Sequence, residues 1–342
     1  MKLNLASLYY VDSRHFVTER DRIFTRSWQL LGPLSRVSKP GQYVSEDIAG
    51  MKVLVIRGKD GELRAFRNVC RHRGAQLIER GEGSCRVIRC PYHNWSYSDK
   101  GELKRAPWFG EDPNFDPAQW PLESIHVDNW RGLVFVCIDP VEPLIDQLGA
   151  TVGELGDVPM EGLTCTDHET LCFSANWKIY TDNFVEGYHI PGIHPAFFAA
   201  IDFEEFDTRA LSGLVKMTAP AIGDLFYKGR WYWMWPNWTL SLFDGGINTS
   251  RINPLNESET ELIYHFYFED SSDEMAAGRR KTIESNLSVI REDFQICLET
   301  HGNYASGGYT SGPLSPRHEQ GVAYFQDRYR SSIASQTEST IE

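Results

Sequence analysis

The stretch Asn-Trp-Lys-Ile-Tyr-Thr-Asp-Asn-Phe-Val-Glu-Gly-Tyr-His-Ile-Pro-Gly-Ile-His, residues 176–194, decides how the rest of the chain is interpreted. The spacing of Asp182, Glu186 and His189 predicts a helix that carries these side chains on one face. A Pro-Gly pair then ends the helix, and His194 follows on the turn, from which it can reach back towards His189. Two histidines with one carboxylate suit non-haem Fe(II). Taken alone, the segment fits equally well a helix with a hydrogen-bonded core histidine and a solvated carboxylate.

A second set of metal-binding side chains lies upstream, where Cys70 and His72 form one pair and Cys90 and His93 form another. Each pair follows a predicted strand, so two loops can close over one shared group. Two thiolates and two imidazoles suit zinc or an iron–sulfur cluster. Structural zinc usually takes a pair of cysteines and a pair of histidines, whereas each pair here mixes the two residue types. The pattern therefore favours a Rieske [2Fe–2S] centre, in which two cysteines bind one iron and two histidines bind the other.

The length and the β-rich segments predict an α+β protein with two domains. At 342 residues the chain is too long for one small domain. Residues 39–140 alternate short β-rich runs with turns, such as those at 59–61 and 98–101, and predict a small antiparallel β domain. Residues 1–38 and 141–342 are assigned to the second domain. For the second domain we expect helices over 12–28, 143–156 and 273–300 and strands over 168–175, 231–242, 249–254 and 261–268.

The overall composition narrows the class of protein. The formal net charge of −13 argues against a nucleic-acid partner, which would require a basic face. No apolar run approaches the roughly 18 residues that cross a bilayer, and the first ten residues lack the apolar core of a signal peptide. Seven cysteines scattered along the chain argue against a disulfide framework and favour a reducing cytoplasm.

Both sets of residues resemble the motifs of one enzyme family. The two Cys-and-His pairs, with Asn94 and Trp95 after the second, are similar to the Rieske motif of ring-hydroxylating oxygenases. Respiratory Rieske proteins differ, because they carry an extra cysteine beside each pair where this chain has Ala75 and Tyr92. The residues that resemble the family's mononuclear-iron motif are Asn176, Trp177, Lys178, Asp182, Asn183, Glu186, Tyr188, His189 and His194. The motifs occur in the family's order and span nearly the whole chain, which is identified as a member of the Rieske non-haem iron oxygenases, as the α subunit.

The resemblance implies a fold and two cofactors. The catalytic domain should adopt the helix-grip fold, an antiparallel sheet wrapped around a long helix. A [2Fe–2S] Rieske cluster would deliver single electrons to a mononuclear Fe(II), which binds and activates O2 next to the substrate. The implied cluster ligands are Cys70, His72, Cys90 and His93, and the implied iron ligands are His189, His194 and Asp293, with Glu292 as the alternative to Asp293.

The resemblance also implies a route for electrons between subunits. In this family the short route crosses from one subunit of a homotrimer to the next. The matching residue is Glu186, which would hydrogen-bond His189 of its own subunit and His93 of the partner subunit. Asp182 is an alternative carboxylate, as the group that orients an imidazole. Asn183 is expected near the iron, as in relatives.

Electrons must come from another protein, because the chain has no Gly-rich dinucleotide fingerprint and no ferredoxin-type cysteine spacing. A separate NAD(P)H-dependent reductase is implied, possibly with a ferredoxin, and some relatives carry a small β subunit as well. Arginines around the cluster loops could dock an acidic electron donor, or equally serve solubility and subunit contacts. They are Arg71, Arg73, Arg80, Arg86 and Arg89.

The sequence indicates a substrate only weakly. Trp231, Trp233 and Trp235 alternate along one predicted strand, so all three are expected on the same side. Such rings can hold a quaternary ammonium by cation–π attraction, stack on an aromatic ring or form sheet core. The segment around Glu186 resembles choline, carnitine and glycine-betaine oxygenases more than naphthalene dioxygenase. We therefore consider three functions: hydroxylation or oxidative N-demethylation of a quaternary ammonium compound, mono- or dihydroxylation of an aromatic acid, and a non-catalytic electron carrier or zinc protein.

Overall fold

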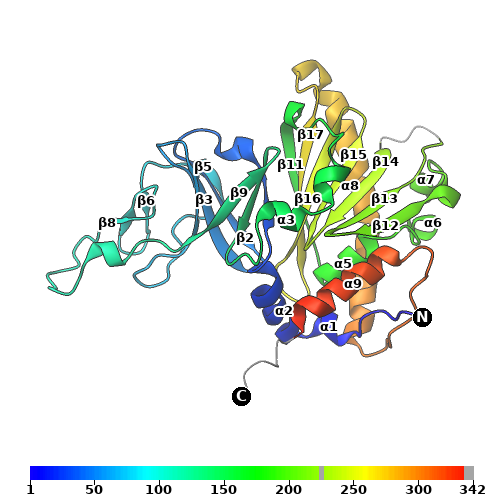
Figure 1. The fold of residues 1–342 in the computed structure, drawn as a ribbon, viewed down its shortest axis with the longest axis horizontal. Coiled ribbons are helices and arrows are strands. Elements are labelled where there is room, and N and C mark those ends of the chain that lie inside the picture. The colour runs from blue at the N-terminus through cyan, green and yellow to red at the C-terminus, as the bar shows by residue number, and fades with distance from the viewer. Residues whose placement is uncertain (223–226, 335–342) are drawn as a thin grey trace. The chain divides into compact units, whose positions relative to one another are not determined.

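The computed structural model describes residues 1–222 and 227–334 and confirms the α+β architecture (Figure 1). The chain folds into two compact units. The first, called here the β unit, spans Thr25–Leu144. The second, called the sheet–helix unit, combines Met1–Phe24 with the chain from Ile145 onward. The strands of each sheet pair antiparallel to their neighbours.

Among the described residues, the β unit contains a seven-stranded sheet in the order β1-β10-β9-β4-β3-β2-β5 and a three-stranded sheet in the order β6-β7-β8. Both predicted hairpins are confirmed, as β3–β4 and β7–β8. Their turns place Gly61 and Gly101 at positive φ, where a Cβ would be strained. The strands are β1 (Gln29–Pro33), β2 (Gln42–Ile48), β3 (Met51–Arg57), β4 (Leu63–Arg67), β5 (Gly81–Ser84), β6 (Ile88–Arg89), β7 (Ser96–Tyr97), β8 (Leu103–Arg105), β9 (Ser124–Trp130) and β10 (Leu133–Cys137).

The single helix predicted over residues 12–28 is wrong. The chain instead forms α1 (Leu8–Val11), α2 (Ser13–Glu19) and a π-helical turn (Arg20–Phe24), followed by β1. Strand β1 pairs with β10, more than a hundred residues later in the chain. The β unit therefore begins before residue 39, the start expected from the sequence, because a partner so distant along the chain leaves no local signal.

The sheet–helix unit is built on a sheet in the order β11-β17-β16-β15-β14-β13-β12. The predicted strands over 168–175, 249–254 and 261–268 and the long helix over 273–300 are confirmed with shifted ends, whereas α9 was not predicted. The strands are β11 (Thr164–Phe173), β12 (Asp207–Leu211), β13 (Leu214–Thr218), β14 (Tyr227–Met234), β15 (Trp238–Phe243), β16 (Gly246–Pro254) and β17 (Thr260–Phe268). The helices are α3 (Leu144–Leu148), α4 (Thr151–Glu154), α5 (Trp177–Phe184), α6 (Ile190–Ile193), α7 (Pro195–Phe198), α8 (Ala276–Ala305) and α9 (Gln320–Ile333).

The long helix α8 runs along the sheet, as expected for a helix-grip fold (Figure 1). Its buried stripe includes Ile283, Leu287 and Ile290, which recur at the helical period. Asn286 lies in the same stripe and accepts a hydrogen bond from the side-chain amide of Asn248 on β16, at 2.8 Å. The helix is thus fixed to the sheet by a polar contact beside its apolar stripe.

The single strand predicted over residues 231–242 is also wrong. It is a hairpin of β14 and β15 in which Met234 pairs with Trp238 across the turn. Pro236 has no backbone N–H and so interrupts the strand ladder. The side chain of Asn237 donates a hydrogen bond to the carbonyl of Ile252 at 2.8 Å and anchors the turn. The β-rich composition on both sides concealed this break.

Helix α5 is anchored by a buried ion pair. The Lys178 Nζ atom lies 2.5 Å from Glu19 Oε1, and both side chains are fully buried. Glu19 also accepts hydrogen bonds from Trp177 Nε1 at 2.8 Å and from the Tyr329 hydroxyl at 2.7 Å. Burial lowers the pKa of Lys178, and the Glu19 carboxylate opposes that shift. One carboxylate therefore ties together α2, α5 and α9.

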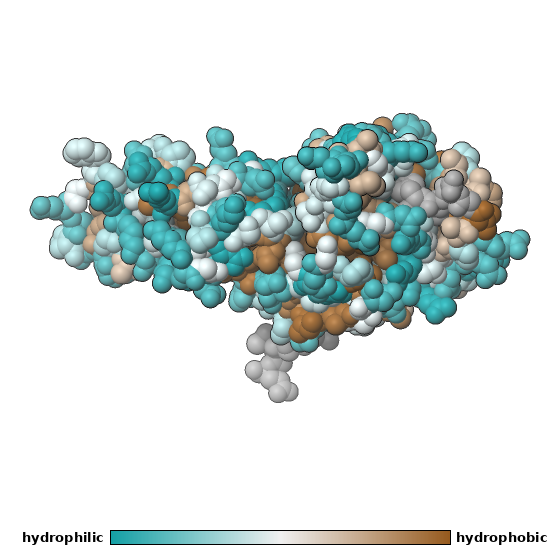
Figure 2. Space-filling model, turned by 90° about the horizontal axis from the view of Figure 1, so that it is seen from above, coloured by the Kyte–Doolittle hydropathy of each residue, from teal (hydrophilic) through white to brown (hydrophobic). Residues whose placement is uncertain are grey.

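Among the described residues, no helix combines the length and the apolar character needed to cross a membrane. The 30-residue α8 is long enough, but it carries charged residues such as Arg291 and Glu292. Figure 2 shows mainly hydrophilic side chains on the face that it presents.

Removing one member of the buried ion pair should be costly. We expect Lys178→Met to lower the free energy of unfolding by about 3–5 kcal/mol, because the Glu19 carboxylate would stay buried without its cation. The double variant Glu19→Leu/Lys178→Met should recover part of that loss. Urea denaturation measures both, with Lys2→Met at the exposed Lys2–Asp327 pair as a control that changes stability by less than about 1 kcal/mol. A double variant less stable than Lys178→Met would contradict this role.

Candidate metal centres and active site

The two Cys-and-His loops of the β unit share one backbone design. In each loop the cysteine N–H donates to the carbonyl five residues on, at 2.8 Å, and the N–H four residues on donates back to the cysteine carbonyl. That fourth position is Gly74 in the first loop and Asn94 in the second, with φ of +73° and +58°. Gly and Asn are the residues that adopt this left-handed conformation most readily. The repeated turn therefore presents Cys70 and Cys90, and the histidines that follow them, in matching ways.

The two histidines of these loops converge. Their Nδ1 atoms, on His72 and His93, lie 3.2 Å apart. The His72 ring stacks on Trp95 with a centroid distance of 4.7 Å and an interplanar angle of 9°. Burial and the positive charge of His93 and Arg73 lower the pKa of His72, which favours the neutral, ligating form of its imidazole.

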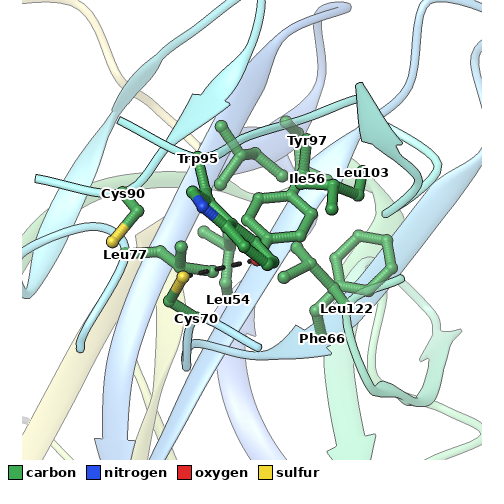
Figure 3. Close-up of a cluster of buried hydrophobic side chains, with 11 residues drawn as sticks. Leu54, Ile56, Phe66, Cys70, Leu77, Cys90, Trp95, Tyr97, Leu103 and Leu122 are labelled. Atoms are coloured by element: carbon green, nitrogen blue, oxygen red, sulfur yellow. Dashed lines mark hydrogen bonds between the residues drawn. The ribbon is translucent and has the colours of Figure 1, made fainter. Parts of the chain in front are cut away.

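The two cysteines lie at the edge of a buried apolar cluster (Figure 3). Cys70 Sγ is 3.3 Å from the Tyr97 hydroxyl, the contact dashed in Figure 3. Burial raises the pKa of the Cys70 thiol, and the hydrogen bond from Tyr97 opposes the shift. Buried cysteines beside half-buried histidines fit the set of ligands that would hold a [2Fe–2S] cluster.

In the sheet–helix unit, residues 176–194 do not form the single helix that their spacing predicts. Helix α5 ends at Phe184, and Glu186 lies in the irregular segment that follows. Pro191 does not stop a helix but occupies the first turn of α6, where its missing N–H costs no hydrogen bond. His189 caps the start of α6, and His194 lies between α6 and α7. Short helices with breaks between them allow both imidazoles to turn towards α8.

The structure brings together His189, His194 and Asp293, and one candidate ligand atom from each lies within 4.8 Å of the others. Asp293 Oδ1 is 3.7 Å from Nε2 of His189 and 2.9 Å from Nε2 of His194. Each Nδ1 atom contacts a glutamate at 2.7 Å: Glu186 for His189, and Glu292 for His194. Of the two acidic residues considered for the third ligand, Asp293 lies in the cluster and Glu292 lies behind an imidazole.

These three groups have the donor arrangement of a cation site. A carboxylate at each Nδ1 accepts a hydrogen bond from the ring N–H, so each Nε2 directs a lone pair towards the other two groups. Asp293 Oδ1 is buried and accepts no hydrogen bond there. Burial lowers the pKa of His194, but the carboxylates of Asp293 and Glu292 outweigh it and raise that pKa overall. Three electron-pair donors this close together repel one another unless a cation binds between them. Two imidazoles with one carboxylate suit Fe(II) as that cation.

A cavity of about 90 Å³ opens beside this cluster. Helix α8 contributes Val289, Ile290 and Asp293, and the sheet contributes residues from β13 to β17. Its aromatic lining consists of Tyr180, Phe184, Phe197, Phe206, Tyr227, Trp231 and Tyr264. Aromatic walls next to a candidate metal site describe a pocket for a small organic molecule.

The three tryptophans expected on one face have different surroundings. Trp231 lines the cavity, with its ring 5.5 Å from those of both Phe197 and Tyr227. The Trp233 ring instead packs edge-on against Phe325 of α9, at 5.4 Å. Trp235 lies beyond the end of β14, so the strand alternation that predicted a common face stops before it.

Asp182 and Asn183 also have different surroundings. The Asp182 carboxylate accepts hydrogen bonds from the Tyr10 hydroxyl at 2.6 Å and from Gln326 Nε2 at 3.0 Å, so its described partners are not imidazoles. Burial raises its pKa to about 7 in spite of these hydrogen bonds. Asp182 lines a second, polar cavity of about 160 Å³, whereas Asn183 and Glu186 line both cavities. Asn183 therefore lines the same cavity as His189, His194 and Asp293.

Sequence reasoning missed most of the cavity wall. Phe206 lies just before β12, a strand that is not among those predicted, and Asn248 comes from a strand with no feature that marks it as functional. The available signal was the alternation of side chains along the C-terminal strands. It indicates which residues share a face of the sheet but not which face meets the mononuclear iron site.

Comparison with known proteins agrees with this geometry. The profile of the Rieske [2Fe-2S] domain matches residues 27–119, and that of the ring hydroxylating alpha subunit (catalytic domain) matches residues 160–221 and 221–335. The carnitine monooxygenase oxygenase subunit of Escherichia coli (strain K12) is 29% identical, with 93% of this chain and 91% of that protein aligned. The chloroplastic choline monooxygenase of Spinacia oleracea is 26% identical, over 93% of this chain and 76% of that protein.

Solved structures give the same assignment. The quaternary ammonium Rieske monooxygenase CntA in complex with L-carnitine superposes with a TM-score of 0.86 and 26% identity, covering 97% of this chain and 96% of that one. Naphthalene 1,2-dioxygenase with indole bound shares the fold, with a TM-score of 0.82 at 20% identity over 97% and 92% of the two chains. The protein therefore belongs to the Rieske non-haem iron oxygenases, as a ring-hydroxylating-type alpha subunit whose cofactors are a [2Fe–2S] cluster and a mononuclear iron.

Proposed function

We propose that this oxygenase acts on a small quaternary ammonium compound and hydroxylates a carbon next to the nitrogen. On an N-methyl group this reaction yields a carbinol that releases formaldehyde, so the overall reaction is N-demethylation. The observation that carries the proposal is the aromatic wall of Phe197, Tyr227 and Trp231 in the cavity that also exposes the carboxylates of Glu186 and Asp293. Aromatic faces and carboxylates both attract a cation. The relatives named for carnitine and choline support this substrate class.

The residues have distinct roles in this proposal. The iron is held by His189, His194 and Asp293, and the cluster by Cys70, His72, Cys90 and His93. When bound, the cluster supplies electrons one at a time and the iron activates O2. Glu186 and Glu292 hold the Nδ1 protons and thereby fix the orientation of the two imidazoles. The apolar cavity wall limits the access of water to the reacting carbon.

Electron transfer between subunits of a homotrimer is part of the proposal. The contact of Glu186 Oε1 with His189 Nδ1, at 2.7 Å, supports the intrasubunit half of this bridge. We propose that the same carboxyl group reaches His93 of the partner subunit, whose imidazole is partly exposed in the single chain. The solved structure of one relative, a quaternary ammonium Rieske monooxygenase, gives insight into inter-subunit electron transfer in that protein.

We propose an NAD(P)H-dependent reductase, possibly with a ferredoxin, as the external electron donor, in a cytoplasmic setting. The docking surface would be the exposed arginines around the cluster loops, which are Arg71, Arg73, Arg80, Arg86 and Arg89. Some of these side chains also make contacts within the chain: Arg80 pairs with Glu46 at 3.2 Å, and Arg73 lies over the Tyr92 ring at 5.4 Å.

The substrate class can be tested directly. The iron-reconstituted protein, supplied with NADH and a surrogate reductase, should form hydroxylated product or formaldehyde from choline, glycine betaine or carnitine and should leave benzoate unchanged. Oxygen uptake matched to product distinguishes turnover from uncoupled reduction. Hydroxylated benzoate with inert ammonium compounds would instead support an aromatic acid as substrate. Zinc without acid-labile sulfide would contradict the cofactor assignment as well.

The third iron ligand can be identified by metal analysis. Asp293→Ala should lose most of the mononuclear iron, because it removes the carboxylate that faces both Nε2 atoms. Glu292→Gln should retain it, because Glu292 contacts only the Nδ1 side of His194. The visible spectrum of the cluster should stay unchanged in both variants and serves as the control for folding. Iron lost from Glu292→Gln but kept in Asp293→Ala would reverse the assignment.

The role of Glu186 can be separated from metal binding. Glu186→Ala should keep both metal centres but lower coupled turnover by roughly 10- to 100-fold. The variant removes the carboxylate that orients the His189 imidazole and, with it, the proposed bridge between subunits. Glu292→Gln, which alters the partner of the other imidazole, is the matched control for orientation alone. Stopped-flow oxidation of the reduced cluster measures the electron-transfer step. Normal turnover in Glu186→Ala would rule out the bridging role.

A further inference from the structure

The cavity lining contains two carboxylates and two histidines. The charged side chains are Glu186 and Asp293, and the two histidines are held by carboxylates. No lysine or arginine is among the lining residues in the described part of the chain. The undescribed stretches, 223–226 and 335–342, contain neither residue type in their sequence. A substrate carboxylate that does not reach the iron would therefore lack a cationic side chain to pair with, and an unpaired buried charge is strongly unfavourable.

Besides Asp293, which faces the two imidazoles, the cavity lining contains a second buried acceptor without a hydrogen-bond partner. Asn248 is 1% exposed, and its Oδ1 atom accepts no hydrogen bond. Its orientation follows from a chain of contacts: Asn286 Nδ2 donates to the Thr282 carbonyl at 2.9 Å, which turns Asn286 Oδ1 towards Asn248 Nδ2 at 2.8 Å. The backbone carbonyl can only accept, so both amides are set, and Asn248 is left with a bare acceptor.

The sheet register places this acceptor in line with the aromatic wall. Trp231 pairs with Ser241 across β14 and β15, and Ser241 pairs with Asn248 across β15 and β16. All three residues line the cavity. Neighbouring strands lie about 5 Å apart, so an indole ring, a hydroxyl and an amide oxygen follow one another across the cavity wall. This row suits a short molecule with a cationic end and a hydrogen-bond-donating end.

We propose that the site selects ammonium compounds that carry a hydroxyl or another hydrogen-bond donor and no carboxylate, and that Asn248 is the residue that recognises the donor. The inference rests on the proposed function, since it assigns the ammonium group to the Trp231 end of the row. An amino alcohol donates its hydroxyl proton to Asn248 Oδ1. An amino acid betaine instead brings a second acceptor to a bare acceptor and leaves its negative charge without a partner.

Binding to the holoenzyme tests this inference without using turnover. Isothermal titration should give a Kd for choline about tenfold or more below that for glycine betaine. Tetramethylammonium, which has the cation alone, reports on the aromatic end. In Asn248→Leu the affinity for choline should fall by about fivefold to tenfold, to the level of tetramethylammonium, whose own Kd should not change. In Asn248→Thr the hydroxyl can donate to Asn286 Oδ1 and still accept from the ligand, so the preference for choline should be largely retained.

The outcomes separate this inference from the proposed function. Glycine betaine binding as tightly as choline, or choline affinity unchanged in Asn248→Leu, would overturn the inference while tetramethylammonium binding still supports an ammonium substrate. Failure of all three ammonium compounds to bind, with benzoate binding instead, would overturn the proposed function itself. The visible spectrum of the cluster and the thermal midpoint of each variant show that it is folded.

Discussion

The contacts between glutamates and the Nδ1 atoms of His189 and His194 are the constraint on which the catalytic site depends. An imidazole presents a usable lone pair at one nitrogen only when the proton is held at the other. Glu186 and Glu292 hold those protons from two different elements, and both Nε2 atoms then meet Asp293. Helix α5 ends at Phe184, so Glu186 contacts His189 from the irregular segment that joins α5 to α6.

Helix α8 serves the site in three ways within about two turns. It supplies Asp293 to the site formed with His189 and His194, and Glu292 to the Nδ1 atom of His194. Through Asn286 it also orients Asn248 on the sheet. These functions require α8 to have one position along the sheet, and its buried stripe of Ile283, Leu287 and Ile290 provides it. Packing and polar positioning are therefore features of the same helix face.

The fold and the side chains of the cavity wall contribute differently to activity. The fold is shared with naphthalene dioxygenase at 20% identity, so the scaffold alone does not choose a substrate. The choice lies in the wall, where aromatic faces and carboxylates favour a cation and a single amide oxygen favours a donor. A few side chains on strands can thus redirect a reaction whose metal chemistry stays the same.

The sequence by itself determined the parts that depend on short spacing. The Cys70 and Cys90 loops were recognisable because each holds its ligand-type residues within four positions of one another, and the resemblance added the acidic pair of α8. Spacing could not show that α5 stops early, since Pro191 is compatible both with ending a helix and with starting one. Only the tertiary structure decided the cavity wall, because Trp231 and Asn248 face it through the register of three strands and through a turn hidden in a continuous β-rich run. Local composition sets which residues can form strands, whereas long-range strand pairing sets which face of each strand meets the mononuclear iron site.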